Sequence, residues 1–370
     1  MKKTLFLLFS FFLLISASAQ TAWPVAKAKA WYAKQRWPVG CNFSPSTAIN
    51  QLEMWQADTF DTLTINKELG WAQGLGMTTV RVFLHDIAYD EDNAGFLQRM
   101  ATFLQISSRH KIKPLFVFFD SVWDPFPAAG KQRDPKPFVH NSGWVQSPGA
   151  NALTDEKSYH RLEKYVKDVV HHFKADNRIF GWDVWNEPDN INGGEYNKQE
   201  PKNKQAIVLV LLQRTFDWAR SQKPIQPLTS GVWYGNWSSN DSLKPIWKVQ
   251  LNNSDIISFH NYDDSKEFDK RIKWLQRYNR PIICTEYMAR GHGSFFKPNL
   301  EIAKRYNVGM YNWGFVSGKT QTIYPWDSWD KQYTGEPDVW FHDIFRADGT
   351  PYKQEEVSYI RNLTGKTKKK

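Results

Sequence analysis

The chain has 370 residues, with 48 Lys and Arg residues against 38 Asp and Glu residues, for a formal net charge of +10. Hydrophobic residues make up 41% of it and charged residues 23%, which excludes an intrinsically disordered chain and predicts a sizeable buried core. The chain contains 18 Trp residues, which is more than a hydrophobic core requires. We therefore expect a ligand with flat apolar faces that can stack on indole rings.

Residues 1–19 are expected to be a secretory signal peptide. A pair of lysines precedes an apolar run over residues 5–15, and the small residues 17–19 form a cleavage site. The run is too short to span a bilayer, and no comparable run follows it in the sequence. The sequence therefore predicts no transmembrane segment, and we expect export to the periplasm or the cell exterior.

Short apolar runs alternate with amphipathic stretches along the rest of the chain. Eight runs have the length and composition of buried parallel strands, and they cover residues 38–43, 79–84, 115–119, 179–185, 227–232, 256–259, 281–285 and 308–313. Helical spacing of apolar residues is clearest over 61–75, 95–110, 157–176, 204–221, 265–278 and 354–363.

This alternation predicts the α/β class and a closed (β/α)8 barrel, the TIM barrel. An open doubly wound sheet is the competing architecture, but it usually carries a Gly-rich phosphate turn after its first strand, and residues 40–45 offer none. The extra length falls mainly in aromatic loops after the third and eighth strands, on the carboxyl face where barrel active sites lie. We expect one catalytic domain over residues 20–363.

The basic charge is concentrated at the C-terminus, where four lysines fall within the last five residues. Residues 364–370 are therefore expected to form a disordered basic tail, and no nucleic-acid partner is expected, because no recognised nucleic-acid module occurs. Cys41 and Cys284 are interpreted as two buried free thiols, although pairing is the alternative. A monomer is expected.

Two glutamates end two of the predicted strands. Glu187 follows the fourth strand in the string Trp185-Asn186-Glu187-Pro188, and Glu286 follows the seventh. The carboxyl ends of all the strands of a barrel meet at one face, so both carboxyl groups should face the same cleft. Paired carboxyl groups that flank a scissile bond are the requirement of glycoside hydrolysis, in which one protonates the leaving oxygen and the other attacks or activates water.

These motifs resemble the clan A glycoside hydrolases, and most closely glycoside hydrolase family five, with its cellulase- and mannanase-type enzymes, or a sister family. The similarity covers roughly residues 36–363. It implies a retaining β-glycoside hydrolase in which Glu187 is the general acid/base and Glu286 the nucleophile. It also implies substrate-site residues, which are Arg81, Asn186, His260, Tyr262 and Trp313.

The resemblance assigns tasks to four of these residues and places His260 beside them. Asn186 would hydrogen-bond the sugar 2-hydroxyl, and Trp313 would form the floor beneath the sugar. Arg81 and Tyr262 would contact the nucleophile and hold the pKa of Glu286 low, while the neighbouring carboxylate would raise the pKa of Glu187.

The sequence departs from the family at the third strand, which ends in Phe118-Phe119-Asp120 where family members usually carry a histidine-bearing motif. His171 and His172 lie at the outer face of a helix and are interpreted as surface residues. No His-Glu-x-x-His or Cys-x-x-Cys motif occurs, so no metal or organic cofactor is expected.

Several alternatives stay open at this point. Trp123, Trp233, Trp326 and Trp329 fit loop packing as well as sugar stacking. The expected ligand is a β-linked oligo- or polysaccharide, but the sugar is not defined, and the long loops could close the cleft into a pocket that favours exo-action. A catalytically inactive carbohydrate-binding barrel and a transglycosylase both fit the same residues.

Overall fold

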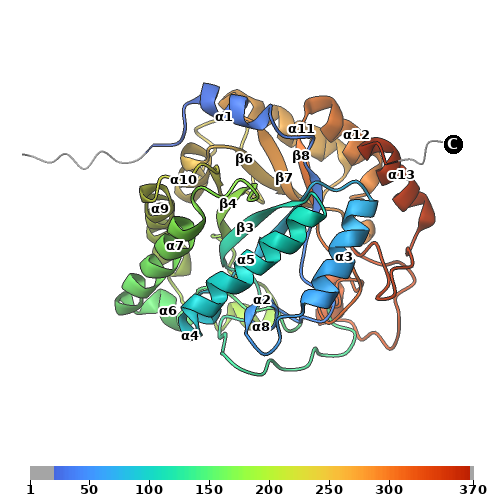
Figure 1. The fold of residues 1–370 in the computed structure, drawn as a ribbon, viewed down its shortest axis with the longest axis horizontal. Coiled ribbons are helices and arrows are strands. Elements are labelled where there is room, and N and C mark those ends of the chain that lie inside the picture. The colour runs from blue at the N-terminus through green and yellow to red at the C-terminus, as the bar shows by residue number, and fades with distance from the viewer. Residues whose placement is uncertain (1–20, 367–370) are drawn as a thin grey trace, which may run out of the picture.

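The computed structural model describes residues 21–366 and forms a single domain built on one parallel sheet (Figure 1). The strands are β1 (Val39–Asn42), β2 (Thr79–Phe83), β3 (Lys113–Asp120), β4 (Gly181–Asn186), β5 (Leu228–Thr229), β6 (Ile257–Asn261), β7 (Ile282–Tyr287) and β8 (Gly309–Asn312). Each overlaps one of the eight predicted runs, so the predicted (β/α)8 barrel is confirmed.

Strand order around the barrel is β5-β4-β3-β2-β1-β8-β7-β6, and every neighbouring pair is parallel. The seam lies between β5 and β6, where the chain just beyond β5 forms a parallel bridge from Val232 to Phe259. There Val232 N donates to Ser258 O at 3.2 Å, and His260 N donates to Val232 O at 2.9 Å. These bonds close the sheet on itself, which removes exposed strand edges.

Helices surround the strands (Figure 1). The α-helices are α1 (Val25–Tyr32), α2 (Gln51–Trp55), α3 (Thr62–Gly74), α4 (Asp86–Glu91), α5 (Asn93–Arg109), α6 (Ala150–Thr154), α7 (Tyr159–Phe173), α8 (Gly194–Asn197), α9 (Lys204–Ser221), α10 (Pro245–Asn253), α11 (Ser265–Leu275), α12 (Phe296–Tyr306) and α13 (Gln354–Thr364). Short 3₁₀ turns cover Glu156–Ser158, Gln276–Tyr278, Arg290–His292 and Trp326–Trp329.

Local sequence explains where several of these helices begin and which face they bury. Asp61, Asp92 and Asp264 precede α3, α5 and α11, and each side chain accepts a hydrogen bond from a backbone N–H of the first turn. Helix α7 buries its apolar stripe against the barrel, while His171 and His172 are exposed, as predicted for surface residues.

The two ends of the barrel are covered differently. Helix α1 lies across the amino end, where Trp31 and Tyr32 pack with Leu115, Phe180 and Ile283. The long segments after β3 and after β8 lie at the opposite end of the molecule, at the bottom of the view in Figure 1. The carboxyl end is therefore the end left for a binding site, as predicted.

The expected signal peptide, residues 1–19, lies outside the described residues, as do residues 367–370 of the expected tail. Helix α13 includes Thr364, which lies one residue beyond the expected end of the domain. The Thr364 hydroxyl donates to Leu75 O at 2.7 Å, so this residue packs with the domain. Within residues 21–366, no helix is both long and apolar enough to cross a membrane. Cys41 and Cys284 are buried and unpaired, so the free-thiol interpretation is confirmed.

Candidate active site

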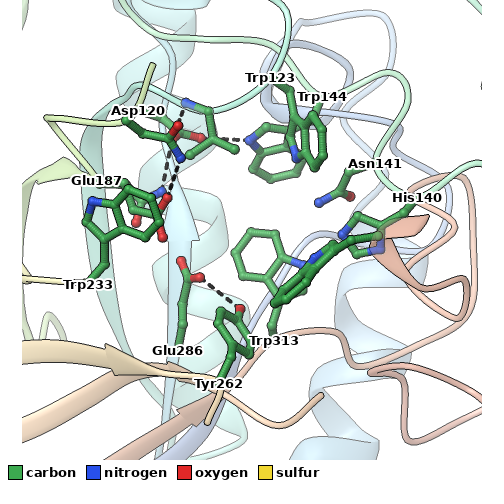
Figure 2. A pocket seen from close by; sticks show the side chains of 14 residues that line it. Asp120, Trp123, His140, Asn141, Trp144, Glu187, Trp233, Tyr262, Glu286 and Trp313 are labelled. Atoms are coloured by element: carbon green, nitrogen blue, oxygen red, sulfur yellow. Dashed lines mark hydrogen bonds between the residues drawn. The ribbon is translucent and has the colours of Figure 1, made fainter. Parts of the chain in front are cut away.

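Glu187 directly follows β4 and reaches into the mouth of the barrel (Figure 2). Its backbone φ is 43°, in the left-handed region. That conformation costs a residue with a side chain about 1–3 kcal/mol, and such strain clusters at functional sites. Its carboxyl group is 7% exposed, with Oε1 2.9 Å from His260 Nδ1 and Oε2 accepting from Asn190 Nδ2 at 2.7 Å.

Glu286 lies near the carboxyl end of β7 and is 5% exposed. Its Oε1 accepts from Arg81 Nη1 at 2.8 Å, and its Oε2 accepts from the Tyr262 hydroxyl at 2.9 Å. The pairing register of β7 shifts beside Glu286, relative to both β6 and β8. Such irregularities re-aim side chains next to active sites, and here they accompany the turn of Glu286 toward the cleft.

The two glutamates are close neighbours. One carboxyl oxygen of Glu187, one of Glu286 and a ring nitrogen of His260 all lie within 4.8 Å of one another. These three side chains are also the one group of His, Cys, Asp and Glu residues within 21–366 whose ligand atoms could together contact a metal ion. Each oxygen of Glu286 already accepts a hydrogen bond, one from Arg81 and the other from Tyr262. The positive charge that faces this carboxylate in the structure is the guanidinium of Arg81.

Arg81, in β2, uses all five of its N–H groups while its side chain is completely buried. Nε and Nη2 donate to Asp183 Oδ2, at 3.0 and 2.8 Å. Nη2 also donates to Asn186 Oδ1 at 2.7 Å, and Nη1 donates to Asn42 Oδ1 at 2.9 Å as well as to Glu286. Arg81 thus lies behind the nucleophile candidate and fixes the orientation of the Asn186 amide.

Asp120 completes this network from the end of β3. Its Oδ1 accepts from Asn186 Nδ2 at 2.9 Å, and its Oδ2 accepts from Trp144 Nε1 at 2.7 Å and from Gln51 Nε2 at 3.3 Å. Sequence analysis noted Asp120 only as a departure from the family. Its position at the carboxyl end of an apolar strand was the signal that could have placed it here, as it placed the two glutamates.

Burial controls the protonation of these groups. It raises the pKa of Glu187 to about 7, an effect that the Asn190 amide partly offsets. Burial likewise raises the pKa of Asp120 to about 7 and lowers the pKa of His260 to about 4, so this imidazole is neutral at neutral pH.

The expectation of a low pKa for Glu286 is wrong. Burial raises the pKa of Glu286 above its ordinary value, and the charge of Arg81 with the hydrogen bond from Tyr262 offsets this only in part. The expected rise at Glu187 is confirmed in direction. Its largest cause is burial, however, and the negative charge that adds to the rise of its pKa is that of Asp189 rather than that of Glu286.

A cavity of about 250 Å³ opens above the two glutamates. Figure 2 shows Glu187 and Trp233 at one side of it, His140 and Asn141 at the other, and Glu286 with Trp313 between them. Much of its lining is aromatic, supplied by Trp123, Trp144, Trp233, Tyr262, Trp313 and Trp326. Carbohydrate rings have apolar faces that stack on such side chains, so the cavity is suited to a sugar.

The structure brings all seven predicted site residues into one cluster, although not all of them line the cavity. Asn186, Tyr262 and Trp313 line it together with the glutamates, whereas Arg81 and His260 lie behind Glu286 and Glu187.

Three of the four undecided tryptophans also line the cavity. Trp123, Trp233 and Trp326 contribute to its lining, while Trp329 stacks on Trp123 with ring centroids 5.0 Å apart.

A (β/α)8 barrel with two buried carboxyl groups and an aromatic-lined cavity at its carboxyl end has the architecture of the retaining glycoside hydrolases. The family model described as "Cellulase (glycosyl hydrolase family 5)" matches residues 139–332, more than half of the chain. The chain therefore belongs to glycosyl hydrolase family 5, and the predicted resemblance is confirmed. No curated protein matches the sequence.

Solved structures with the same fold include several mannan-active enzymes. The exo-β-1,4-mannosidase Op5Man5 from Opitutaceae bacterium strain TAV5 has a TM-score of 0.60 at 17% identity, over 89% of this chain and 59% of that one. The endo-1,4-β-mannanase from Rhizomucor miehei has a TM-score of 0.56 at 15% identity, over 88% and 97%. The Streptomyces cattleya GH5_18 structure in complex with GlcNAc has a TM-score of 0.59 at 12% identity, over 89% and 79%.

At such low identities the likeness establishes the fold. The chain spans only 59% of the length of the Opitutaceae mannosidase, so the activity of that whole protein does not transfer with the fold.

Proposed function

We propose that Glu187 is the general acid/base and Glu286 the nucleophile of a double displacement on a β-linked glycan. The observation that carries this proposal is the separation of the pair, with carboxyl oxygens within 4.8 Å of each other. Retaining glycosidases hold their carboxyl groups about 5–5.5 Å apart, whereas inverting ones need about 6.5–9.5 Å to admit a water.

The hydrogen bonds support this division of roles. Two donors, Arg81 and Tyr262, point at the two oxygens of Glu286 and favour its carboxylate form. Glu187 instead contacts two neutral groups, the Asn190 amide and the His260 imidazole, and its pKa of about 7 leaves it largely protonated in mildly acidic solution. The acid and the nucleophile are thus distinguished by their surroundings.

In the first step, the Glu286 carboxylate attacks the anomeric carbon while the proton of Glu187 moves to the glycosidic oxygen. The bond from the anomeric carbon to that oxygen breaks, an ester to Glu286 forms, and the aglycone leaves as an alcohol. In the second step, Glu187 takes a proton from a water whose oxygen attacks the anomeric carbon. The ester then breaks, Glu286 returns as a carboxylate, and the β configuration is retained.

Asn186 and Trp313 are assigned to the bound sugar. The amide oxygen of Asn186 is held by Arg81 and one amide hydrogen by Asp120, which leaves the second amide hydrogen for the sugar 2-hydroxyl. Trp313 is braced edge-on by Phe83 and Trp144, with ring centroids 5.8 Å away in both cases, and would carry the apolar face of the ring.

The lining of the cavity favours a neutral glycan over a uronic acid. Asp120, Glu187 and Glu286 contribute carboxyl groups, and no Lys or Arg is among the described residues that line the cavity. His140 adds no charge at neutral pH, because burial lowers its pKa to about 4. A β-mannoside is the first substrate to test, given the mannan-active structural neighbours, and the expected leader at residues 1–19 would place the enzyme outside the cytoplasm.

The test compares Glu187→Gln and Glu286→Gln with Glu355→Gln, an exposed control on α13. Glu286→Gln should lose activity on every aryl β-glycoside, since no nucleophile remains. Glu187→Gln should lose about 10²–10⁴-fold with a poor leaving group. With a dinitrophenyl β-glycoside, the rate of the first step should fall far less in Glu187→Gln, because dinitrophenolate leaves without being protonated. The control should match the wild type.

The readouts are initial rates, circular dichroism for folding, and proton NMR of the first product. An α-anomer from a β-glycoside, or normal turnover by either folded variant, would refute the proposed roles. Binding of oligosaccharides without turnover by the wild type would instead identify a binding barrel, and transfer to a sugar acceptor would identify a transglycosylase.

A further inference from the structure

The loops after β3 and β8 are joined to each other at the mouth of the barrel. We define the loop wall as residues 136–144 together with residues 320–329. Gln321 is its central tie, because Phe138 N donates to its Oε1 at 2.7 Å and its Nε2 donates to Lys136 O at 2.7 Å and Val139 O at 3.0 Å. Asn141 N also donates across the junction to Thr320 O at 2.9 Å. The wall is therefore a hydrogen-bonded structure rather than two separate loops.

His140 ties the same loops a second time. Its backbone N donates to Ser328 Oγ at 3.0 Å, its Nδ1 lies 2.9 Å from Tyr324 O, and its carbonyl accepts from Trp329 Nε1 at 2.9 Å. Trp329 in turn stacks on Trp123, with an interplanar angle of 15°. His140 is 1% exposed, so these bonds are shielded from water.

The loop wall bounds the cavity on the side away from Glu187 (Figure 2). Of the wall residues that line the cavity, His140, Asn141 and Trp144 are buried and Trp326 is half-buried. A second cavity, of about 30 Å³, shares Asn141, Trp144 and Trp313 with the first. A single water needs about 10–15 Å³, so that space admits about two waters and no sugar ring.

The side near Glu187 is different. Asn190 and Trp233 line the cavity there and are half-buried, and the chain beyond Trp233 is exposed at Gly235 and Asn236. The cavity is thus bounded mostly by buried groups at the wall and by half-buried groups on the side of Glu187.

We propose that the enzyme is exo-acting and removes single residues from the non-reducing end of its glycan, an inference that rests on the proposed function. The leaving group must lie beside Glu187, the proton donor, so the sugar attacked by Glu286 must lie toward the loop wall. A chain extending beyond that sugar would meet the wall. The cavity of about 250 Å³ is also smaller than the roughly 300–1,000 Å³ of pockets for larger ligands.

Asn141 supplies a specific contact for this terminal sugar. Its Oδ1 is buried without a hydrogen-bond partner, and its side chain lines the cavity. This oxygen is shielded even from a molecule the size of water, so a ligand in the cavity would meet the amide nitrogen of Asn141 instead. A hydroxyl oxygen at the non-reducing end of the sugar is the group that would accept from it.

The first experiment follows products of the wild-type enzyme. Its probes are reducing-end-labelled β-1,4-linked pentasaccharides of mannose, glucose and xylose, with the 4-nitrophenyl β-glycosides of the same monosaccharides and disaccharides. We expect early products shortened by one residue, and nitrophenol release from monosaccharide glycosides. Early products of intermediate length, or release of an intact disaccharide from the disaccharide glycosides, would overturn exo-action while leaving the proposed function intact.

The second experiment opens the wall. Gln321→Ala removes the tie without touching the cavity, and Gln332→Ala changes an exposed glutamine of the same loop. We expect internal cleavage to rise about tenfold relative to terminal cleavage in Gln321→Ala, because its hydrogen bonds hold the wall closed, and no change in Gln332→Ala. An unchanged product pattern in folded Gln321→Ala would contradict the role of the wall. Inactivity of the folded wild type on every probe would instead contradict the proposed function.

Discussion

Asp120 adds a further buried carboxyl group to a site in which one guanidinium, that of Arg81, already contacts Asp183 and Glu286. Its pKa is raised to about 7 first by burial, and the negative charge of Glu187 adds to the rise. Because charge repulsion is mutual, Asp120 should also disfavour ionisation of Glu187, in addition to burial and the charge of Asp189, which raise the pKa of Glu187. The residue that departs from the family pattern therefore helps to keep the acid protonated, besides holding the amide of Asn186.

The rate of hydrolysis should follow a narrow bell-shaped curve on the acid side of neutrality. Activity needs Glu187 protonated, so it should fall as pH rises through about 7. It also needs Glu286 ionised, so it should fall as pH drops through a pKa that burial raises above the ordinary value. The measurement is kcat/KM against pH on an aryl β-glycoside, and a plateau extending to pH 9 would contradict it.

The same profile tests Asp120 as a positioning residue. Asp120→Asn removes a negative charge near Glu187, so the alkaline limb should move to lower pH, and kcat should fall about 10–100-fold as Asn186 loses its alignment. Asp134→Asn, at an exposed position of the same loop, is the control and should shift neither. If Asp120 had only a structural role, Asp120→Asn would reduce the amount of folded enzyme but would leave the alkaline limb of the pH profile where it is in the wild type.

Among the elements, the strands were predictable and the loops were not. Each strand is a buried apolar run, so the periodicity of the sequence located it, and the rule that functional groups follow barrel strands located Glu187 and Glu286. Helices such as α2, α6 and α8 were missed because they span only four or five residues and leave no clear amphipathic pattern.

Sequence spacing does not show which aromatic residues of the loops line the cavity and which ones support them, because this depends on contacts between loops. Trp123 and Trp329 come from different loops, and only their stacking shows that one lines the cavity while the other supports it. Asn141 likewise gives no sequence signal, since it lies in a loop and only the folding of that loop brings its side chain to the cavity. Tertiary packing decides such roles.

Strands β1 and β2 approach each other closely at Gly40, where there is no room for a side chain. Gly40 pairs with Thr79, and a Cβ on Gly40 would lie 1.9 Å from the Thr79 carbonyl oxygen. Gly40→Ala should therefore destabilise the protein by about 3 kcal/mol or more, because backbone rather than a flexible side chain would have to move. Gly335→Ala is the control, since its Cβ would meet nothing within 4 Å. The measurement is urea unfolding, and equal midpoints for the two variants would contradict the close approach.

At the scale of the whole molecule, the barrel interior is organised around Arg81. From β2 its guanidinium contacts Asn42 of β1, Asp183 of β4 and Glu286 of β7, so one side chain links four strands at the level of the site. Buried ion pairs of this kind contribute more to geometry than to net stability, but removing one partner leaves an uncompensated charge. The architecture and the chemistry thus depend on the same contacts.

The two thiols lie within the same closed barrel and should not cross-link while it is folded. Cys41 is in β1 and Cys284 in β7, with β8 between them. Strands two positions apart are about 9–10 Å apart, whereas a disulfide needs Cα atoms about 4.4–6.8 Å apart. Burial also raises the pKa of both thiols far above the ordinary value, which suppresses the reactive thiolate.

The melting temperature should therefore be the same with and without a millimolar reductant. A thiol reagent such as Ellman's reagent should label neither cysteine of the native enzyme and both cysteines in urea. The labelling rate should follow global unfolding, because both side chains are completely buried and opening of the barrel is what exposes them. A non-reduced mass lower by two hydrogens, or rapid labelling of the native enzyme, would mean that the strands around β8 separate far more readily than their continuous pairing implies.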